Sequence, residues 1–200
     1  MIDIANEITK IDDVFEPIIN DIVSKRLIVY SESFNIKDLP NHNDFEVHPN
    51  TLPEFDYLFR PLDKKNSDCL YWFELESNEK AVKLNNLLNE YRQSNIKEDA
   101  DYRNIPATNK NETSNVLYVG IRRGSKSKKP RLTNIVGRIN QHLGYYENKN
   151  TQGLQLIHFA KNCDFKLTLN VVEIISTNSI YLNIIEKKVA DILKPLCGRH

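Results

Sequence analysis

The chain has 200 residues, of which 40% are hydrophobic and 27% are charged, as expected for one soluble domain with or without an extension. No apolar stretch is long enough to cross a bilayer, and the N-terminus lacks the pattern of a signal peptide, so we expect a cytoplasmic protein that does not contact a membrane. Three distant cysteines form neither a zinc pattern nor a disulfide framework.

The formal net charge of zero conceals a strong asymmetry along the chain. Residues 1–60 hold 12 acidic and 5 basic side chains, whereas residues 115–200 hold 5 acidic and 14 basic ones. Such an asymmetry predicts that the C-terminal part faces a polyanion. The alternative is that the two parts of the chain neutralise each other by direct contact.

The first third of the chain contains one clear helical pattern. Isoleucines and a phenylalanine recur in steps of three and four between Ile4 and Ile22, which predicts an amphipathic helix that bends or restarts at Pro17. Its apolar face is suited to packing or to a homodimer contact. Residues 27–30 suit a short strand, and the proline-rich residues 33–62 suggest a loop.

The remaining chain alternates between strand and helix patterns. Aromatic and β-branched runs predict three strands, at 70–75, 115–121 and 166–175. Helical patterns occur at 77–91, 132–143, 152–161 and 178–193. This order predicts an α/β (α+β) fold with a small three-stranded, mainly antiparallel sheet flanked by helices.

Two polar residues of one predicted helix could act on a phosphate. Arg138 and His142 are four positions apart and therefore lie on the same side of the helix. A guanidinium group can hold a phosphate through two hydrogen bonds, and an imidazole beside it can move a proton. The alternative is that both residues belong to a solvated polar face.

Glu186 occupies an unusual position in the last predicted helix. It follows Ile184 and Ile185, and further apolar residues lie one turn away on either side. An unpaired carboxylate is seldom found among apolar neighbours, but a divalent cation would stabilise it there. Alternatively, Glu186 pairs with a nearby lysine such as Lys187, or lies at an exposed edge.

Tyr71 and Tyr118 lie in predicted strands, and Gly120 would let a ligand approach the second strand closely. Either tyrosine could instead be an ordinary core aromatic. The second strand leads into a loop, residues 122–131, with six basic residues and no acidic one. These residues are candidates for binding a nucleic-acid backbone: Arg122, Arg123, Lys126, Lys128, Lys129 and Arg131. The alternative is a solvated surface loop.

Together these residues resemble the GIY-YIG nuclease superfamily over roughly residues 69–198. The family has two short tyrosine-bearing strands, a helix with an arginine and a histidine four residues apart, and a glutamate on a later helix. Tyr118-Val119-Gly120 matches its second triplet, and Arg138, His142 and Glu186 match the other hallmarks. Cys69-Leu70-Tyr71 stands at the first triplet with two replacements.

The chain departs from the family pattern in the spacing of the triplets and near its end. Residues from about 77 to 113 would be an insertion between the first two strands, such as restriction-type members carry to grip duplex DNA. The family's late asparagine is not evident, and Pro195-Leu-Cys-Gly198 stands in its usual surroundings. The resemblance implies an N-terminal helical extension, residues 1–66, and a nuclease domain, residues 67–200.

The resemblance implies a metal-dependent endonuclease that hydrolyses DNA phosphodiester bonds with Mg²⁺ or Mn²⁺. Glu186 would bind the metal, Arg138 would neutralise charge in the transition state, and either tyrosine would activate water while His142 relays the proton. One alternative is a non-catalytic nucleic-acid-binding protein with the same fold. Another is a structural partner protein that acts through the N-terminal helix and the acidic first 60 residues.

Overall fold

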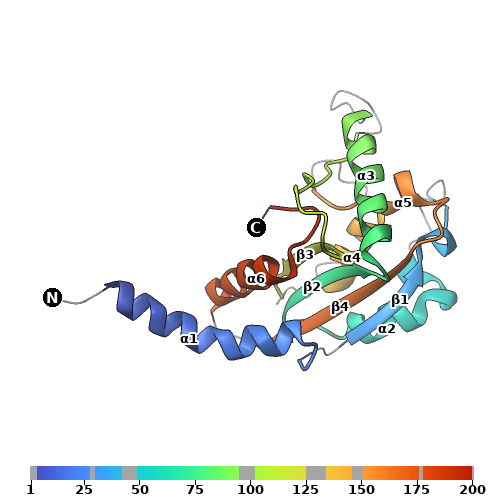
Figure 1. Cartoon of the computed structure of the whole chain (residues 1–200). Coiled ribbons are helices and arrows are strands. Elements are labelled where there is room, and N and C mark those ends of the chain that lie inside the picture. Colours follow the sequence, from blue (N-terminus) through green and yellow to red (C-terminus); the bar gives the residue numbers. More distant parts are fainter. Residues whose placement is uncertain are drawn as a thin grey trace.

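A computed structural model of the chain describes residues 4–27, 30–41, 49–94, 102–124, 134–145, 151–175 and 178–199. Within these ranges the fold is α+β, with a four-stranded antiparallel sheet and six α-helices (Figure 1). The strands are β1 (Tyr30–Asn35), β2 (Asp68–Leu75), β3 (Val116–Arg122) and β4 (Lys166–Ile174). The helices are α1 (Ile4–Val23), α2 (Asp56–Asp63), α3 (Asn78–Ser94), α4 (Ile135–Leu143), α5 (Leu156–Ala160) and α6 (Ser179–Leu193).

The predicted number of strands is wrong, because β1 adds a fourth strand and gives the order β1-β4-β2-β3. β1 is short and mostly polar, but it buries Tyr30 and Phe34 and pairs along its length with β4. The prolines that suggested a loop lie beyond this strand, and α2 forms around one of them, Pro61. β1 thus attaches part of the predicted N-terminal extension to the sheet of the predicted nuclease domain.

β2 is a central strand that is buried on both faces. Tyr71 and Phe73 point to the face covered by α2, α3, α4 and α5. Leu70 and Trp72 point to the opposite face, which α1 and α6 cover. Side chains alternate between the two faces of a strand, so a run that is apolar at every position fits a strand between two helical layers.

A C-terminal segment covers the outer edge of β3. The backbone N–H groups of Leu196 and Cys197 donate to the carbonyl oxygens of Val116 and Leu117, both at 3.0 Å. Covering an edge strand in this way blocks pairing with another chain. It also brings Cys197 next to Tyr118, with which it forms a β-bridge.

α1 packs beside α6, and its N-terminal end extends beyond the sheet (Figure 1). It continues without a restart through Pro17. Phe15, Ile19 and Ile22 pack into the core, whereas Val14 remains 68% exposed. In the parts of the chain that the structure describes, no helix is long and apolar enough to cross a membrane.

Candidate active site

Two tyrosines and a glycine from β2 and β3 form the floor of the candidate site. Tyr71 pairs with Gly120 across the two strands, and Phe73 pairs with Tyr118. The rings of Tyr71 and Tyr118 stack with their centroids 6.3 Å apart. A Cβ atom at Gly120 would lie 2.7 Å from the Tyr71 hydroxyl oxygen and 2.6 Å from Cε1 of Tyr118. Glycine therefore lets both phenols lie over this point of the sheet.

Arg138 extends from α4 over both phenols. Its Nε atom donates to the Tyr71 hydroxyl oxygen at 2.8 Å, and one terminal nitrogen donates to the Tyr118 hydroxyl oxygen at 3.3 Å. The other terminal nitrogen donates to Oε1 of Gln141 and to the backbone carbonyl of Gln152, both at 2.7 Å. These contacts fix the plane of the guanidinium group, so its charge is directed at the tyrosines.

His142 lies one turn further along α4 and is fully buried. Its Nδ1 atom accepts a hydrogen bond from the backbone N–H of Leu154 at 3.2 Å. The pKa of His142 is far below its usual value because of burial and the adjacent Arg138 charge, so the ring is neutral. With Nδ1 as the acceptor, the ring proton is on Nε2, which donates to the Tyr71 hydroxyl oxygen at 2.8 Å.

The Tyr71 hydroxyl oxygen therefore accepts two hydrogen bonds, from Arg138 and from His142. Burial raises the pKa of Tyr71 above its usual value, and Tyr118 raises it further, whereas Arg138 lowers it. Burial also raises the pKa of Tyr118, again opposed by Arg138. The free protein thus holds both phenols protonated at neutral pH, with hydrogen-bond donors already positioned around the Tyr71 oxygen.

Glu186 lies in α6 and is partly buried beside Ile185 and Val189. Within the described ranges its carboxylate forms no hydrogen bond or ion pair. Burial raises the pKa of Glu186, and the charges of Arg138 and Lys187 oppose that rise. The Glu186 charge in turn raises the pKa of both Tyr71 and Tyr118, so this carboxylate lies within electrostatic range of the tyrosine pair.

The structure thus brings four of the five residues expected to act in catalysis into direct contact, which are Tyr71, Tyr118, Arg138 and His142. The fifth, Glu186, is linked to them only by its electrostatic effect. The sequence analysis missed Gln141, Gln152 and Leu154. Gln141 could have been found, since it is one turn from Arg138 on the same helix. Gln152 and Leu154 contribute only backbone atoms, which no side-chain pattern reveals.

The basic loop begins at the end of β3, directly beyond Gly120. Arg122 is partly exposed and Arg123 is exposed, and the backbone N–H of Gly124 donates to Oδ1 of Asp68 at 2.7 Å. The other four candidates for backbone binding lie outside the described residues: Lys126, Lys128, Lys129 and Arg131.

The donor chemistry of Glu186 fits a magnesium ion held mostly by water and substrate. Among the described residues no group of three or more histidines, cysteines or acidic residues could hold a metal. Mg²⁺ is nevertheless often bound by one or two carboxylates together with waters and substrate phosphates. Glu186 is partly buried and could supply one such carboxylate.

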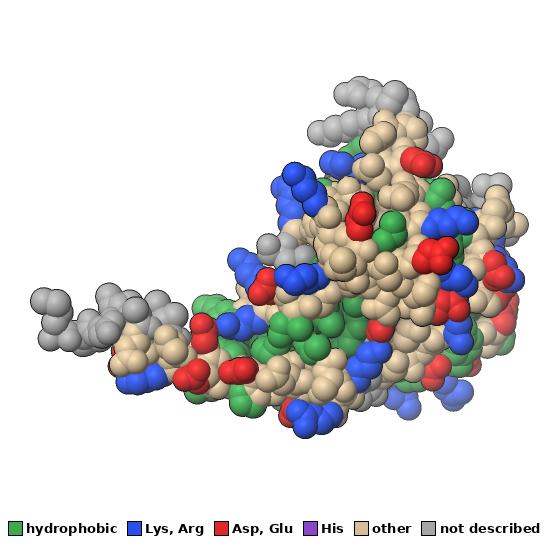
Figure 2. All heavy atoms as spheres, viewed as in Figure 1, with side chains coloured by type: hydrophobic (Ala, Val, Ile, Leu, Met, Phe, Trp, Pro, Cys, Tyr) green, Lys and Arg blue, Asp and Glu red, His purple; other side chains and the backbone are tan. Residues whose placement is uncertain are grey.

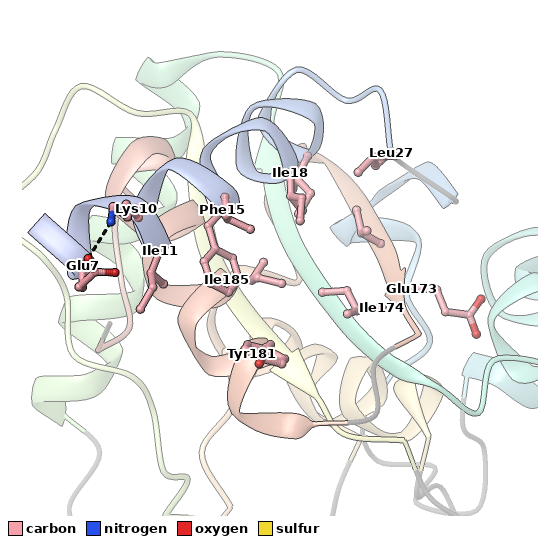
Figure 3. A pocket seen from close by; sticks show the side chains of 13 residues that line it. Glu7, Lys10, Ile11, Phe15, Ile18, Leu27, Glu173, Ile174, Tyr181 and Ile185 are labelled. Carbon is pink, nitrogen blue, oxygen red and sulfur yellow. Dashed lines mark hydrogen bonds and ion pairs between the residues drawn. The ribbon is translucent and has the colours of Figure 1, made fainter.

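An apolar groove of about 890 Å³ lies on the opposite face of the sheet, between α1, α6 and β4 (Figure 3). Its walls include Ile11, Phe15, Ile18, Ile174, Tyr181 and Ile185. The charged residues at its rim form ion pairs, Glu7 with Lys10 and Glu173 with Lys65. It therefore offers apolar contact area rather than groups for catalysis.

Comparisons of the chain with protein-family models, with curated proteins and with solved structures find no match. Conclusions about function therefore depend on the geometry of the site.

Proposed function

We propose that the protein is a metal-dependent endonuclease of the GIY-YIG type that hydrolyses DNA phosphodiester bonds. One observation carries this proposal: the Tyr71 hydroxyl oxygen accepts hydrogen bonds from both Arg138 and His142. A packing tyrosine needs no such pair of donors. A tyrosine that must become a phenolate needs them, because they stabilise the negative charge on its oxygen.

Tyr71 is the general base in this proposal. Arg138 and His142 occupy two positions around its oxygen, so the phenol proton points away from both of them. The phenol first releases that proton to solvent. The phenolate then takes a proton from a water molecule, and the water oxygen forms the new bond to phosphorus as the bond to the leaving oxygen breaks. The leaving oxygen takes up a proton from solvent. His142 then positions Tyr71, and it does not relay a proton, because both of its ring nitrogens already form hydrogen bonds.

Arg138 acts on the scissile phosphate as well as on the tyrosines. Its positive charge lowers the pKa of Tyr71 and of Tyr118, which offsets part of the effect of burial. The guanidinium group stays protonated at any physiological pH. Four of its five N–H groups donate to Tyr71, Tyr118, Gln141 and Gln152, so the fifth is left to donate to an oxygen of the phosphate. Charge that develops on those oxygens in the transition state is stabilised by a donor that is already in place.

Glu186 would hold the divalent cation. A bound Mg²⁺ would polarise the phosphoryl oxygens and stabilise the leaving oxygen. Burial raises the pKa of Glu186, so ionisation of its carboxylate has a free-energy cost that a bound cation would reduce. Among the described residues none forms an ion pair with Glu186, so its carboxylate is not committed to a cationic side chain of the protein.

Duplex DNA is the proposed substrate because residues 115–200 are strongly basic. Arg122 and Arg123 extend this positive charge from the Gly120 end of β3. A non-catalytic DNA-binding protein with this fold would use the same surface, but it would not need a phenol placed between an arginine and a neutral histidine.

The direct test is incubation of supercoiled plasmid with Mg²⁺ or Mn²⁺, and with chelator. We expect nicked or linear product only when metal is present. Arg138→Lys keeps the charge but loses the planar fork, so it should still bind DNA and lose cleavage. Salt-sensitive DNA binding without cleavage under any metal would instead favour the non-catalytic alternative.

We also propose that a second copy of the chain covers the groove along α1. A helix of this length spans about 30 Å, and its exposed face carries Ile11, Val14 and Ile18. Tyr181 of α6 continues the same surface, which Figure 2 shows as an apolar area between α1 and the body of the molecule. Apolar patches of this kind on soluble proteins commonly mark interaction sites.

A further inference from the structure

A short segment of main chain, residues 152–155, lies against α4 and contacts two side chains of the candidate active site. We call this segment the clamp. The carbonyl oxygen of Gln152 accepts a hydrogen bond from Arg138 at 2.7 Å. Two residues later, the backbone N–H of Leu154 donates to Nδ1 of His142 at 3.2 Å. Backbone groups of one segment thus orient both the guanidinium group and the imidazole ring.

Gly153 lies between these two contacts and is buried against the backbone of α4. A Cβ atom at this position would lie 2.7 Å from the carbonyl oxygen of Gln141 and 3.1 Å from its Cγ atom. The carbonyl oxygen belongs to the main chain of a helix, so it cannot rotate away as the end of a side chain could. Gly153 does not have a positive φ angle, so what requires a glycine here is space and not backbone conformation. A side chain at position 153 would therefore push the clamp away from α4 and weaken the hydrogen bonds on either side.

The clamp is fixed in place by contacts along its length. The backbone N–H of Gly153 donates to the carbonyl oxygen of Asn104 at 3.0 Å, and the side chains of Leu154 and Leu156 are fully buried. Between the two leucines, Gln155 is 1% exposed and has a left-handed backbone conformation, with φ 59° and ψ 38°. This conformation is strained for a residue other than glycine, and it persists only where the surrounding structure determines it. A change of conformation at Gln155 would therefore move the N–H of Leu154.

We propose that Gly153 is a positioning residue of the candidate active site, because only a residue without a side chain lets the clamp hold Arg138 and His142 at the same time. The inference rests on the proposed function for what these two residues do in cleavage, whereas the clamp itself is a property of the free protein. Arg138 must meet Tyr71 and a phosphate oxygen in one geometry, and a displacement of about 1 Å in such a group can lower the rate about 10²-fold. Loss of the Leu154 donor would also free Nδ1 of His142, which is the contact that directs the ring proton to Nε2.

The first test compares two substitutions that each add one carbon at a buried position. Gly153→Ala adds it between the clamp and α4, whereas Val189→Ile adds it to the core on the other face of the sheet. The readout is the ¹⁵N NMR signal of Nδ1 of His142 in the free protein at pH 7.5, identified by its absence from the spectrum of His142→Gln. In Gly153→Ala we expect this signal to move toward the value of an imidazole nitrogen without a hydrogen bond. In Val189→Ile it should stay at the wild-type value.

A second pair of variants decides the question if Gly153→Ala does not fold. Gln155→Gly and Gln155→Val both remove the side-chain amide, but glycine adopts a positive φ angle freely and the β-branched valine does not. We expect the wild-type Nδ1 signal in Gln155→Gly and a shifted signal in Gln155→Val. The proposal is overturned by a wild-type signal in Gly153→Ala, by an equal shift in Val189→Ile, or by equal signals in the two Gln155 variants.

Plasmid cleavage then tests the effect of the clamp on catalysis. We expect kcat of Gly153→Ala to fall by about 10²-fold, because Arg138 loses its fixed position, while affinity for a DNA duplex measured with chelator falls by less. An unchanged kcat would overturn the positioning role, as would a loss confined to affinity. The NMR readout needs no substrate, so the clamp can stand when the wild-type protein fails to cut, and it can fail when the wild type cuts.

Discussion

The Nε2 atom of His142 lies 2.8 Å from the hydroxyl oxygen of Tyr71, and the histidine is the donor in this hydrogen bond. The direction follows from the other side of the ring, where Nδ1 accepts the backbone N–H of Leu154. A backbone contact twelve residues away in sequence thereby decides which nitrogen carries the proton, and so which charge state of Tyr71 is stabilised.

The two tyrosines should differ in their effect on catalysis. Tyr71→Phe removes the proposed general base, so we expect cleavage at saturating DNA to fall by about 10²–10⁴-fold with little change in DNA binding. Tyr118→Phe removes a longer hydrogen bond to Arg138 and should cost less. Tyr30→Phe is a matched control, because Tyr30 is also buried and its hydroxyl donates to the Leu58 carbonyl at 2.6 Å, away from the site. A larger loss for Tyr118→Phe than for Tyr71→Phe would reassign the base.

Stability should depend on the neutral state of His142. The pKa of His142 is lowered in the folded protein, whereas the unfolded chain has an ordinary histidine pKa of about 6.5. The stabilisation of the folded state by His142 is therefore fully present above about pH 6.5. It is lost as the pH falls toward the pKa that His142 has in the folded protein. In this pH range the unfolded chain binds one more proton than the folded protein, which lowers the free energy of unfolding by about 1.4 kcal/mol for each pH unit of acidification. Thermal unfolding between pH 7.5 and 5 should show this slope in the wild type and a shallower one in His142→Gln.

Glu186 has the opposite effect on the pH dependence of stability, so its effect must be measured separately from that of His142. Its pKa is raised in the folded protein, so its protonation favours the folded state as the pH falls toward its unfolded value of about 4.3. In Glu186→Gln, the free energy of unfolding should therefore fall more steeply with decreasing pH than in the wild type. An identical pH slope in the presence and absence of His142 would contradict the buried neutral ring.

Gly120→Ala should disturb both phenols at once. The added Cβ atom would lie 2.7 Å from the Tyr71 hydroxyl oxygen and 2.6 Å from Tyr118 Cε1, which forces at least one ring to move. We expect a loss of about 1–3 kcal/mol in the free energy of unfolding, as for other overpacked cores, together with a strong loss of cleavage. Chemical denaturation measures the first quantity.

A second substitution tests the cause of that loss. Tyr71→Phe removes the oxygen that the new methyl group meets, so the double variant Gly120→Ala/Tyr71→Phe should be less destabilised than the sum of the two single variants. If the losses in the free energy of unfolding of the two single variants are additive in the double variant, the contact with the Tyr71 oxygen is not the cause of the destabilisation by Gly120→Ala.

Glu186→Ala should abolish cleavage while largely sparing DNA binding, because a metal ligand stabilises the transition state more than the bound ground state. Asp191→Asn is the control on the same helix, since Asp191 is an exposed carboxylate. Plasmid cleavage and duplex binding are measured for both variants over a range of Mg²⁺ concentrations. Wild-type rates in Glu186→Ala, or full activity of the wild type in excess chelator, would remove the metal role from Glu186.

Five of the six helices in the described ranges and the three longer strands could be predicted from the sequence because their signals are local. The exception is α2, Asp56–Asp63, which lies mostly within residues expected to form a loop. Arg138 and His142 are four residues apart on one helix, so their shared face follows from helical geometry alone. A short strand was expected at residues 27–30, whereas β1 spans Tyr30–Asn35. Its residues after Tyr30 are mostly polar, and its burial comes from pairing with β4 far along the chain. The same holds for the hydrogen bond from Leu154 to His142 and for the edge segment beside Tyr118, which depend on contacts between distant segments.

The oligomeric state should respond to charge placed on the exposed face of α1. Val14 is 68% exposed and Ile18 is 41% exposed, so Val14→Glu/Ile18→Glu should leave the folded chain nearly as stable as the wild type. If a second copy covers this face, the two carboxylates would be buried without partners in the dimer, and sedimentation velocity should show a monomer in place of the wild-type dimer. Tyr57→Glu is the control, because Tyr57 is 46% exposed on α2, away from the groove, and should leave the dimer intact. A wild-type protein that sediments as a monomer across the micromolar range would rule out this use of the groove.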